Sequence, residues 1–225
     1  MVAGTVIPGP DLRGPRRRLI EALAAQGIRD LAVLKAFDEV PRHLFVPTGV
    51  RHRAYEDAPL PIGAGQTISQ PYVHALYLQL LGLTGRERVL EVGTGSGFQT
   101  ALLSRLAAQV FTVERVRALL DSARAVLDHH GVRNVSYLCG DGTLGWRDYG
   151  PYDAILVGAG APKMPMPLVE QLAENGRLLV PVGDREKQAL WLVTRTPTGV
   201  RQEAVADMRF VPLVGSHGWL EAGTA

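Results

Sequence analysis

The chain has a single cysteine, Cys139, among its 225 residues. One thiol cannot form an internal disulfide or a cysteine-rich metal site, so we expect no metal and a reducing compartment. The formal net charge of only +2 argues against nucleic-acid binding by bulk electrostatics. No apolar run approaches the roughly 18 residues that span a bilayer, and residues 1–10 do not resemble a signal peptide. We therefore predict a cytoplasmic monomer without nucleic-acid or membrane partners.

What the chain does have is a regular alternation of apolar strands and amphipathic helices after residue 82. The predicted strands are 88–92, 110–114, 135–139, 153–158, 177–182, 189–194 and 204–211, and the predicted helices among them are 97–107, 116–130 and 165–173. This order predicts an α/β, Rossmann-like fold with a mostly parallel seven-stranded sheet and helices on both faces. The late strands lack an intervening helix, which predicts an antiparallel hairpin. Cys139 is expected in the core.

The first 82 residues follow a different pattern. Residues 1–15 are rich in glycine and proline and are expected to be irregular, and two helices should follow, the second capped by Asp30. Residues 41–70 predict a structured loop with short strands, and a helix should begin at Pro71. We interpret residues 1–82 as an N-terminal helical and loop region, and residues 83–225 as the sheet core of one integrated domain.

A glycine-rich turn follows the strand 88–92, and an acidic residue, Glu114, ends the next strand about twenty positions later. The turn contains Gly93, Gly95 and Gly97, which allow close approach of the backbone to a ligand. The carboxyl ends of parallel strands meet at one edge of the sheet, which also brings Asp141 there. The layout predicts a nucleoside site in which Glu114 accepts hydrogen bonds from ribose hydroxyls.

The spacing G-x-G-x-G differs from the G-x-G-x-x-G of dinucleotide sites. Glu91, two residues before the first glycine, would repel a pyrophosphate but could bind an ammonium group. S-adenosylmethionine has an ammonium group, a sulfonium centre and no phosphate, and it fits better; its product is S-adenosylhomocysteine. Asp141 would accept from the adenine amine and Gly142 would leave room for the ring. Simpler roles stay open: a salt bridge for Glu91, an ion pair for Glu114 and an Asp-Gly turn for Asp141.

Motifs along nearly the whole chain are shared with one family. They are Val40–Pro47, Ala54–Asp57, Leu60–Gly63, Gly65–Pro71, Leu90–Gly97, Pro181–Gly183 and Arg209–Leu213. From about Leu19 to Trp219 the sequence resembles the protein-L-isoaspartate (D-aspartate) O-methyltransferases. The resemblance implies a repair enzyme that methylates the α-carboxylate of L-isoaspartyl residues in damaged proteins, using S-adenosylmethionine. The ester then closes to a succinimide, part of which opens to aspartate.

The resemblance also implies the site residues. Ser69 would position the acceptor carboxylate, with Gln66, Thr67 and Ile68 beside it and Val211 facing it. The positions that match the cofactor site are Glu91, Gly93, Gly95, Gly97, Glu114, Asp141, Gly142 and, less closely, His74. Two alternatives stay open, because Ser69 could cap the following helix and Gln66 could bridge loops.

Three rival functions are also open. The first is an S-adenosylmethionine-dependent methyltransferase for a peptide natural product or a small acid; such relatives often carry an added C-terminal region, whereas this chain stops soon after Trp219. The second is a nicotinamide oxidoreductase, against which the glycine spacing and Glu91 argue. The third is a non-catalytic nucleoside-binding module, against which the retained Thr67–Ser69 segment argues.

Overall fold

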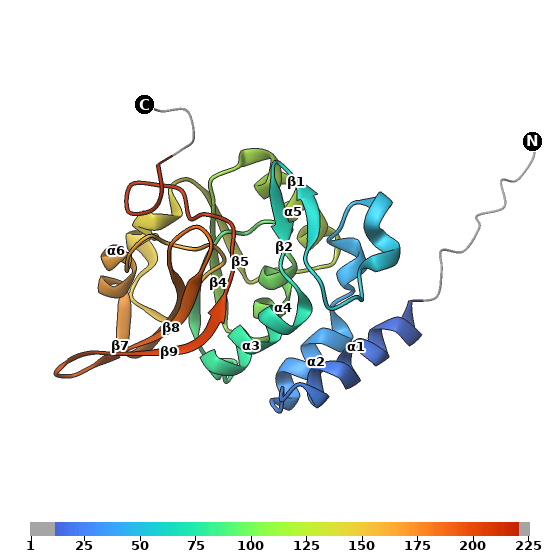
Figure 1. The fold of residues 1–225 in the computed structure, drawn as a ribbon, viewed down its shortest axis with the longest axis horizontal. Coiled ribbons are helices and arrows are strands. Elements are labelled where there is room, and N and C mark those ends of the chain that lie inside the picture. The colour runs from blue at the N-terminus through green and yellow to red at the C-terminus, as the bar shows by residue number, and fades with distance from the viewer. Residues whose placement is uncertain (1–11, 221–225) are drawn as a thin grey trace, which may run out of the picture.

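The computed structural model describes residues 12–220, so the predictions for residues 1–11 lie outside the described part. One seven-stranded sheet has the order β5-β4-β3-β6-β7-β8-β9 (Figure 1). Its strands are β3 (Arg88–Val92), β4 (Gln109–Glu114), β5 (Val135–Cys139), β6 (Tyr152–Val157), β7 (Leu172–Gly183), β8 (Gln188–Thr196) and β9 (Gly199–Met208). The pairs from β5 to β7 are parallel, and β8 runs antiparallel to both β7 and β9. The predicted sheet and its antiparallel end are confirmed.

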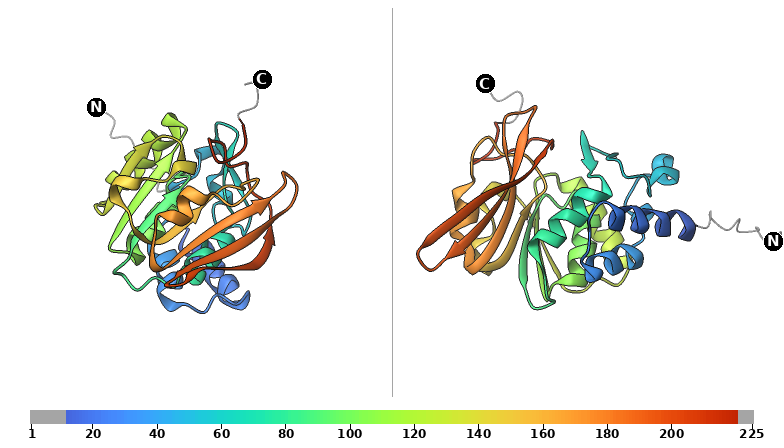
Figure 2. Two further views of the ribbon diagram at one scale, coloured as in Figure 1. Left: turned by 90° about the vertical axis from the view of Figure 1, so that its left-hand side faces the viewer. Right: turned by 60° about the horizontal axis from the view of Figure 1, so that its bottom comes forward.

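Helices cover both faces of the sheet. They are α1 (Arg13–Ala25), α2 (Leu31–Glu39), α3 (Pro71–Leu81), α4 (Phe98–Leu106), α5 (Arg117–His129) and α6 (Met166–Glu170). Val89 and Val110 face a core shared with α1 to α5, whereas Leu90 and Phe111 face a core shared with α6, as the alternation of strand side chains requires. Figure 2 shows α1 and α2 at the opposite side of the molecule from the β7–β9 edge. No helix within residues 12–220 is long and apolar enough to cross a membrane.

Three element boundaries differ from the predictions, and one is the start of the strand expected at 177–182, which is β7 at Leu172–Gly183. The helix expected at 165–173 is only Met166–Glu170, because Leu172 already pairs with Tyr152 at the start of β7. The last strand, expected at 204–211, is β9 at Gly199–Met208. Val211 therefore lies in the segment after the strand.

The environment of Cys139 and the start of the first helix also differ from the predictions. Cys139 is exposed, because it is the last residue of β5, the edge strand of the sheet. Residues 13–15, which were expected to be irregular, belong to α1, which begins at Arg13. Asp30 does cap α2, with its Oδ1 accepting from Ala32 N at 2.9 Å.

A small hairpin brings the N-terminal region over the sheet. It consists of β1 (Leu60–Gly63) and β2 (Gln66–Ile68), and a Cβ added at Gly95 would lie 3.6 Å from Ile62 Cδ1. Segment 66–70 therefore lies over the glycine turn that follows β3. The strand order places β4 on one side of β3 and β6 on the other, which is the switch point where such sheets bind ligands.

Candidate active site

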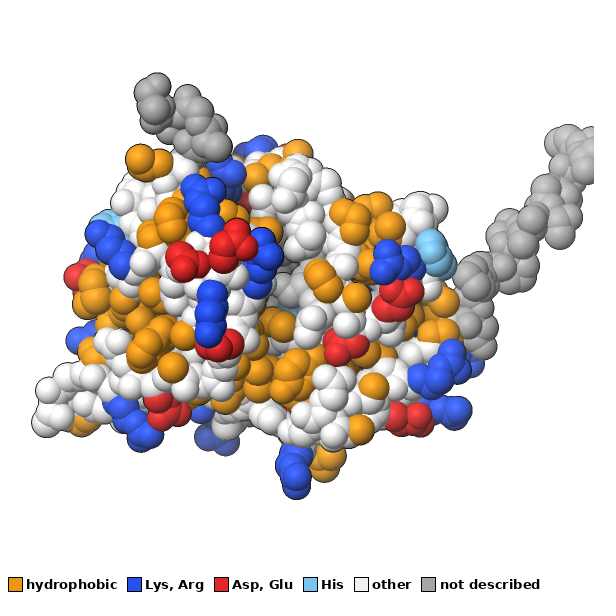
Figure 3. All heavy atoms as spheres, in the orientation of Figure 1, with side chains coloured by type: hydrophobic (Ala, Val, Ile, Leu, Met, Phe, Trp, Pro, Cys, Tyr) orange, Lys and Arg blue, Asp and Glu red, His pale blue; other side chains and the backbone are white. Residues whose placement is uncertain are grey.

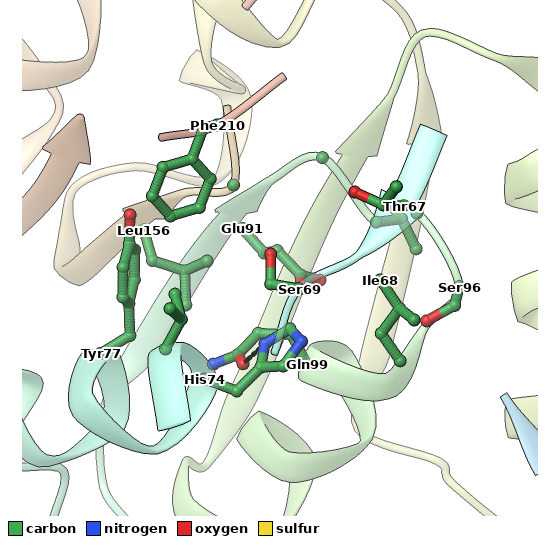
Figure 4. Close-up of a pocket in the computed structure, with 15 residues that line it drawn as sticks. Thr67, Ile68, Ser69, His74, Tyr77, Glu91, Ser96, Gln99, Leu156 and Phe210 are labelled. Carbon is green, nitrogen blue, oxygen red and sulfur yellow. Dashed lines mark hydrogen bonds between the residues drawn. The ribbon is translucent and has the colours of Figure 1, made fainter. Parts of the chain in front are cut away.

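Two cavities and a groove meet at this edge of the sheet. Ser69, His74 and Glu91 are among the residues that line the inner cavity (Figure 4). Glu114 and Gly142 help to line an outer cavity, and Ser69 also lines a surface groove. Of the predicted site residues, all but Gly97 and Asp141 line one of these spaces. Thr67 borders all three spaces, and Val211 borders the outer cavity and the groove. Gln66 borders only the outer cavity, and Ile68 borders only the inner cavity.

Glu91 is fully buried on β3, and only half of its carboxylate is satisfied. Oε2 accepts from Thr100 Oγ1 at 2.5 Å and from Thr112 Oγ1 at 2.7 Å. Thr94 lies 2.6 Å from the Thr112 hydroxyl and must donate to it, since the Thr112 proton points to Glu91. Among the described residues, Oε1 has no partner, so the salt-bridge alternative does not apply. Burial raises the pKa of Glu91 from 4.5 to about 8, and the two threonine hydroxyls act against this rise.

His74 on α3 contacts Gln99 on α4 through Nδ1 and Oε1. Because Gln99 Oε1 can only accept, Nδ1 carries the proton and Nε2 is left as an acceptor. Burial lowers the pKa of His74 to about 3, so the ring is neutral at pH 7. His74 Nε2 and Gln99 Nε2 are buried and have no partner among residues 12–220. The inner cavity thus presents an unpartnered acceptor on His74, an unpartnered donor on Gln99, and Oε1 of Glu91. Because Oε2 accepts from both threonines, the proton of the neutral carboxyl is on Oε1, which becomes an acceptor when Glu91 ionises.

Glu114 fixes the glycine turn. Its Oε2 accepts from Gly95 N and its Oε1 from Val116 N, both at 2.9 Å. Gly97 has a φ of +84°, and a Cβ there would lie 3.0 Å from Ala123 Cβ on α5. Gly97 therefore allows close packing of the turn against α5 and does not border the ligand space.

Asp141 forms the Asp-Gly turn that was left open as an alternative. Its Oδ1 accepts from Thr143 N at 2.9 Å, and its Oδ2 accepts from Ser216 N at 2.7 Å, which ties the turn to the C-terminal segment. A Cβ at Gly142 would lie 2.5 Å from Val92 Cγ1, so packing against β3 requires glycine there. Gly142 also borders the outer cavity, and the room it would leave for an adenine ring stays a prediction. The role of Asp141 toward an adenine amine stays a prediction.

A hydrogen bond from Arg42 holds the backbone of Ser69 in place. The buried guanidinium donates from Nη2 to Ser69 O at 3.0 Å and from Nε to Ala54 O at 2.8 Å. Burial lowers the pKa of Arg42 to about 9, which leaves it charged at pH 7. Helix α3 begins after Gln70 with no side-chain cap, so capping does not account for Ser69.

Sequence reasoning gave no role to Arg42, Gln99 or Thr100. Arg42 belongs to a quoted motif, but nothing in the sequence marks an arginine as buried. A signal did exist for Gln99 and Thr100, because both polar side chains lie in the buried first turn of α4. Buried polar groups need partners, and here the partners are site residues.

Comparison with known proteins decides the family. A family model described as "Protein-L-isoaspartate(D-aspartate) O-methyltransferase (PCMT)" matches residues 15–218. The chain belongs to this family. Two curated members, each called protein-L-isoaspartate O-methyltransferase, are from Syntrophus aciditrophicus, 50% identical over 208 residues, and Syntrophobacter fumaroxidans, 52% identical over 205. Each alignment covers 91% of this chain, and 95% or 96% of the relative.

Solved structures agree with this assignment. A protein-L-isoaspartate O-methyltransferase superposes with a TM-score of 0.83 at 32% identity, over 90% of this chain and 67% of that one. A putative family member from Plasmodium falciparum, in complex with S-adenosyl-L-homocysteine, superposes with a TM-score of 0.78 at 28% identity, over 88% of this chain and 98% of that one. The family and the Rossmann-like methyltransferase fold predicted from the motifs are confirmed.

The proton on Glu91 should make the ligand-free protein less stable as pH rises. Its folded pKa of about 8 lies above the ordinary 4.5, so between these values the unfolded chain has already released a proton that the folded chain retains. The free energy of unfolding therefore falls as pH increases through this window. We expect Glu91→Gln to remove this part of the fall when urea unfolding is measured from pH 5 to 8.

Glu21→Gln, on exposed α1, is the matched control and should keep the wild-type pH dependence. If the free energies of unfolding of wild type and Glu91→Gln change in parallel over this range, Glu91 does not hold a proton.

Proposed function

We propose that this chain transfers a methyl group from S-adenosylmethionine to the α-carboxylate of L-isoaspartyl residues in damaged proteins. The observation that carries the proposal is Ser69, which borders both the inner cavity with its unpartnered polar atoms and the open groove. A cofactor and a peptide could therefore meet at this residue. The names of the relatives support the acceptor, and the S-adenosyl-L-homocysteine in the Plasmodium falciparum protein supports the cofactor.

The residues present fit this cofactor. His74 Nε2 offers an acceptor for an ammonium group, and Glu91 Oε1 would offer a second one once the nearby cation favours loss of its proton. Gln99 Nε2 offers a donor for a carboxylate. Glu114 and Gly142 would border the nucleoside. When bound, the cofactor supplies a methyl group on a sulfonium cation.

The protein needs no general base for this reaction. A carboxylate with a reference pKa near 4 is already ionised at neutral pH. The Ser69 hydroxyl can orient it with one modest hydrogen bond, whereas a guanidinium fork would stabilise the ground state more strongly. Tyr77 and Phe210 give the inner cavity an apolar wall, and exclusion of water favours a transition state in which opposite charges partly cancel. The remaining contribution is in-line positioning.

The acceptor is a backbone defect, so we propose main-chain recognition of an extended peptide. The Val211 carbonyl accepts from Gly160 N at 2.8 Å, which leaves the Val211 N–H as the main-chain group for a peptide. Ile68 is buried and pairs with Leu60, so its side chain belongs to the core. Residues 1–82 and 83–225 would act as one domain, because a single core cluster joins α1 to the sheet. The monomeric state and the cytoplasmic location stay predictions, which sedimentation velocity and cell fractionation would test.

The first test uses two peptides that differ only in L-isoaspartate or aspartate at one position. We expect methyl transfer from labelled S-adenosylmethionine to the isoaspartyl peptide alone, as a base-labile ester. Transfer to neither peptide, with the cofactor bound, would refute the proposed substrate. It would favour the rival acceptors, a peptide natural product or a small acid.

The second test is Ser69→Ala. Loss of one hydrogen bond to a carboxylate should lower kcat/KM by about tenfold to a hundredfold. The affinity for S-adenosylhomocysteine, measured by calorimetry, should stay near the wild-type value. Ser136→Ala on the edge strand β5 is the control. Equal losses of turnover and of cofactor affinity would contradict the assigned role.

A further inference from the structure

The groove beside Ser69 carries charge of one sign. It has a volume of about 400 Å³, and its charged lining residues are Arg185 and Arg209. Arg185 lies in the turn between β7 and β8, and Arg209 follows β9. Figure 3 shows basic and acidic side chains side by side next to a central hollow on this face. Both charged side chains that line the acceptor groove are therefore basic, although the whole chain is nearly neutral.

The turn that carries Arg185 is held in one conformation. Asp184 Oδ1 accepts from Glu186 N at 2.8 Å and from Lys187 N at 2.7 Å. The buried Gln188 donates to Asp184 O and accepts from Phe210 N at 2.8 Å. These bonds fix the turn to the segment that borders both the groove and the inner cavity.

The Arg185 guanidinium also rests on an aromatic platform. Its Cζ lies 4.9 Å from the centroid of the Trp219 ring. Trp219 is itself anchored, because its Nε1 donates to Gly160 O at 3.0 Å. Stacking on an aromatic face restricts the guanidinium and leaves its N–H edges available for a planar carboxylate.

The nearby carboxylates are engaged elsewhere. Glu186 pairs with Arg209 at 3.1 Å, Asp207 pairs with Lys187 at 2.9 Å, and Asp184 holds the turn. Within residues 12–220, Arg185 has no ion pair. It is a cation of restricted orientation without a carboxylate partner, on the rim of the groove where the substrate would lie.

We propose that Arg185 binds a carboxylate that flanks the isoaspartyl residue in the substrate peptide. The carboxylate comes from a neighbouring aspartate or glutamate, or from the C-terminus of the peptide. The enzyme consequently prefers damaged sites with such a neighbour. The inference rests on the proposed function and adds a specificity subsite to it. The flanking carboxylate is distinct from the acceptor carboxylate, which Ser69 positions.

The test compares isoaspartyl peptides with Glu, Gln or Lys at one flanking position, each position being tried in turn with an amidated C-terminus. We expect kcat/KM at low salt to be about threefold to tenfold higher for Glu than for Gln at one position, and lowest for Lys. A neutral series with free or amidated C-termini distinguishes a terminal carboxylate from a side-chain carboxylate. Arg185→Gln should bring the Glu-to-Gln ratio close to one, and Arg185→Glu should reverse the preference in favour of Lys.

Lys187→Gln is the matched control, because it removes the same charge from the same turn but does not line the groove. It should keep the wild-type Glu-to-Gln ratio. Equal kcat/KM values for all flanking residues in wild type, or the same loss of preference in Lys187→Gln, would overturn the subsite. Failure of every peptide, neutral ones included, would instead overturn the proposed function, so the two failures are distinguishable.

Discussion

The site depends on one carboxylate buried at the end of a central strand. Glu91 cannot move toward solvent, because β3 is paired with β4 on one side and β6 on the other. Two threonine hydroxyls satisfy one of its oxygens and nothing described satisfies the other. Burying such a group is unfavourable unless it is neutralised or paired. A ligand cation at the unsatisfied oxygen would remove this penalty, so affinity and charge selectivity would arise from the same constraint.

The N-terminal region completes the site that the sheet begins. The sheet supplies Glu91 and Glu114 at the ends of adjacent strands, whereas Ser69 and His74 come from the loop and helix before it. Arg42 connects these parts, because its buried guanidinium donates to the Ser69 carbonyl and lies 5.0 Å from the centroid of the Phe98 ring on α4. The guanidinium acts on backbone carbonyls and leaves the serine hydroxyl free to meet a substrate. Helix α3 adds His74 to the inner cavity, although most of its other residues pack in the core.

Local patterns in the sequence predicted local structure well. Alternating apolar runs located the strands, and the glycine turn with Glu91 and Glu114 located the ligand edge, because each signal depends on neighbours in the chain. The errors concern contacts between distant segments. Asp141 bonds to Ser216, which is 75 residues away, so the sequence could not show this contact, although the role of Asp141 toward an adenine amine stays a prediction. Cys139 lies on an apolar run that resembles a core strand, and only the strand order makes it an edge.

The same long-range limit applies to the groove. A methyltransferase for carboxylates must orient an anion without neutralising it, because a strong cationic partner would lower the ground state as well as the transition state. In the structure, the group that would orient the acceptor carboxylate and the group that would attract an anionic peptide lie at different places. A hydroxyl, Ser69, lies where the groove meets the inner cavity, and the uncompensated guanidinium of Arg185 lies on the rim. Positive charge at the rim can attract and select an anionic peptide without contacting the reacting oxygen. The positions of these polar and charged side chains, rather than the net charge of the chain, therefore allow a nearly neutral protein to act on a negatively charged group.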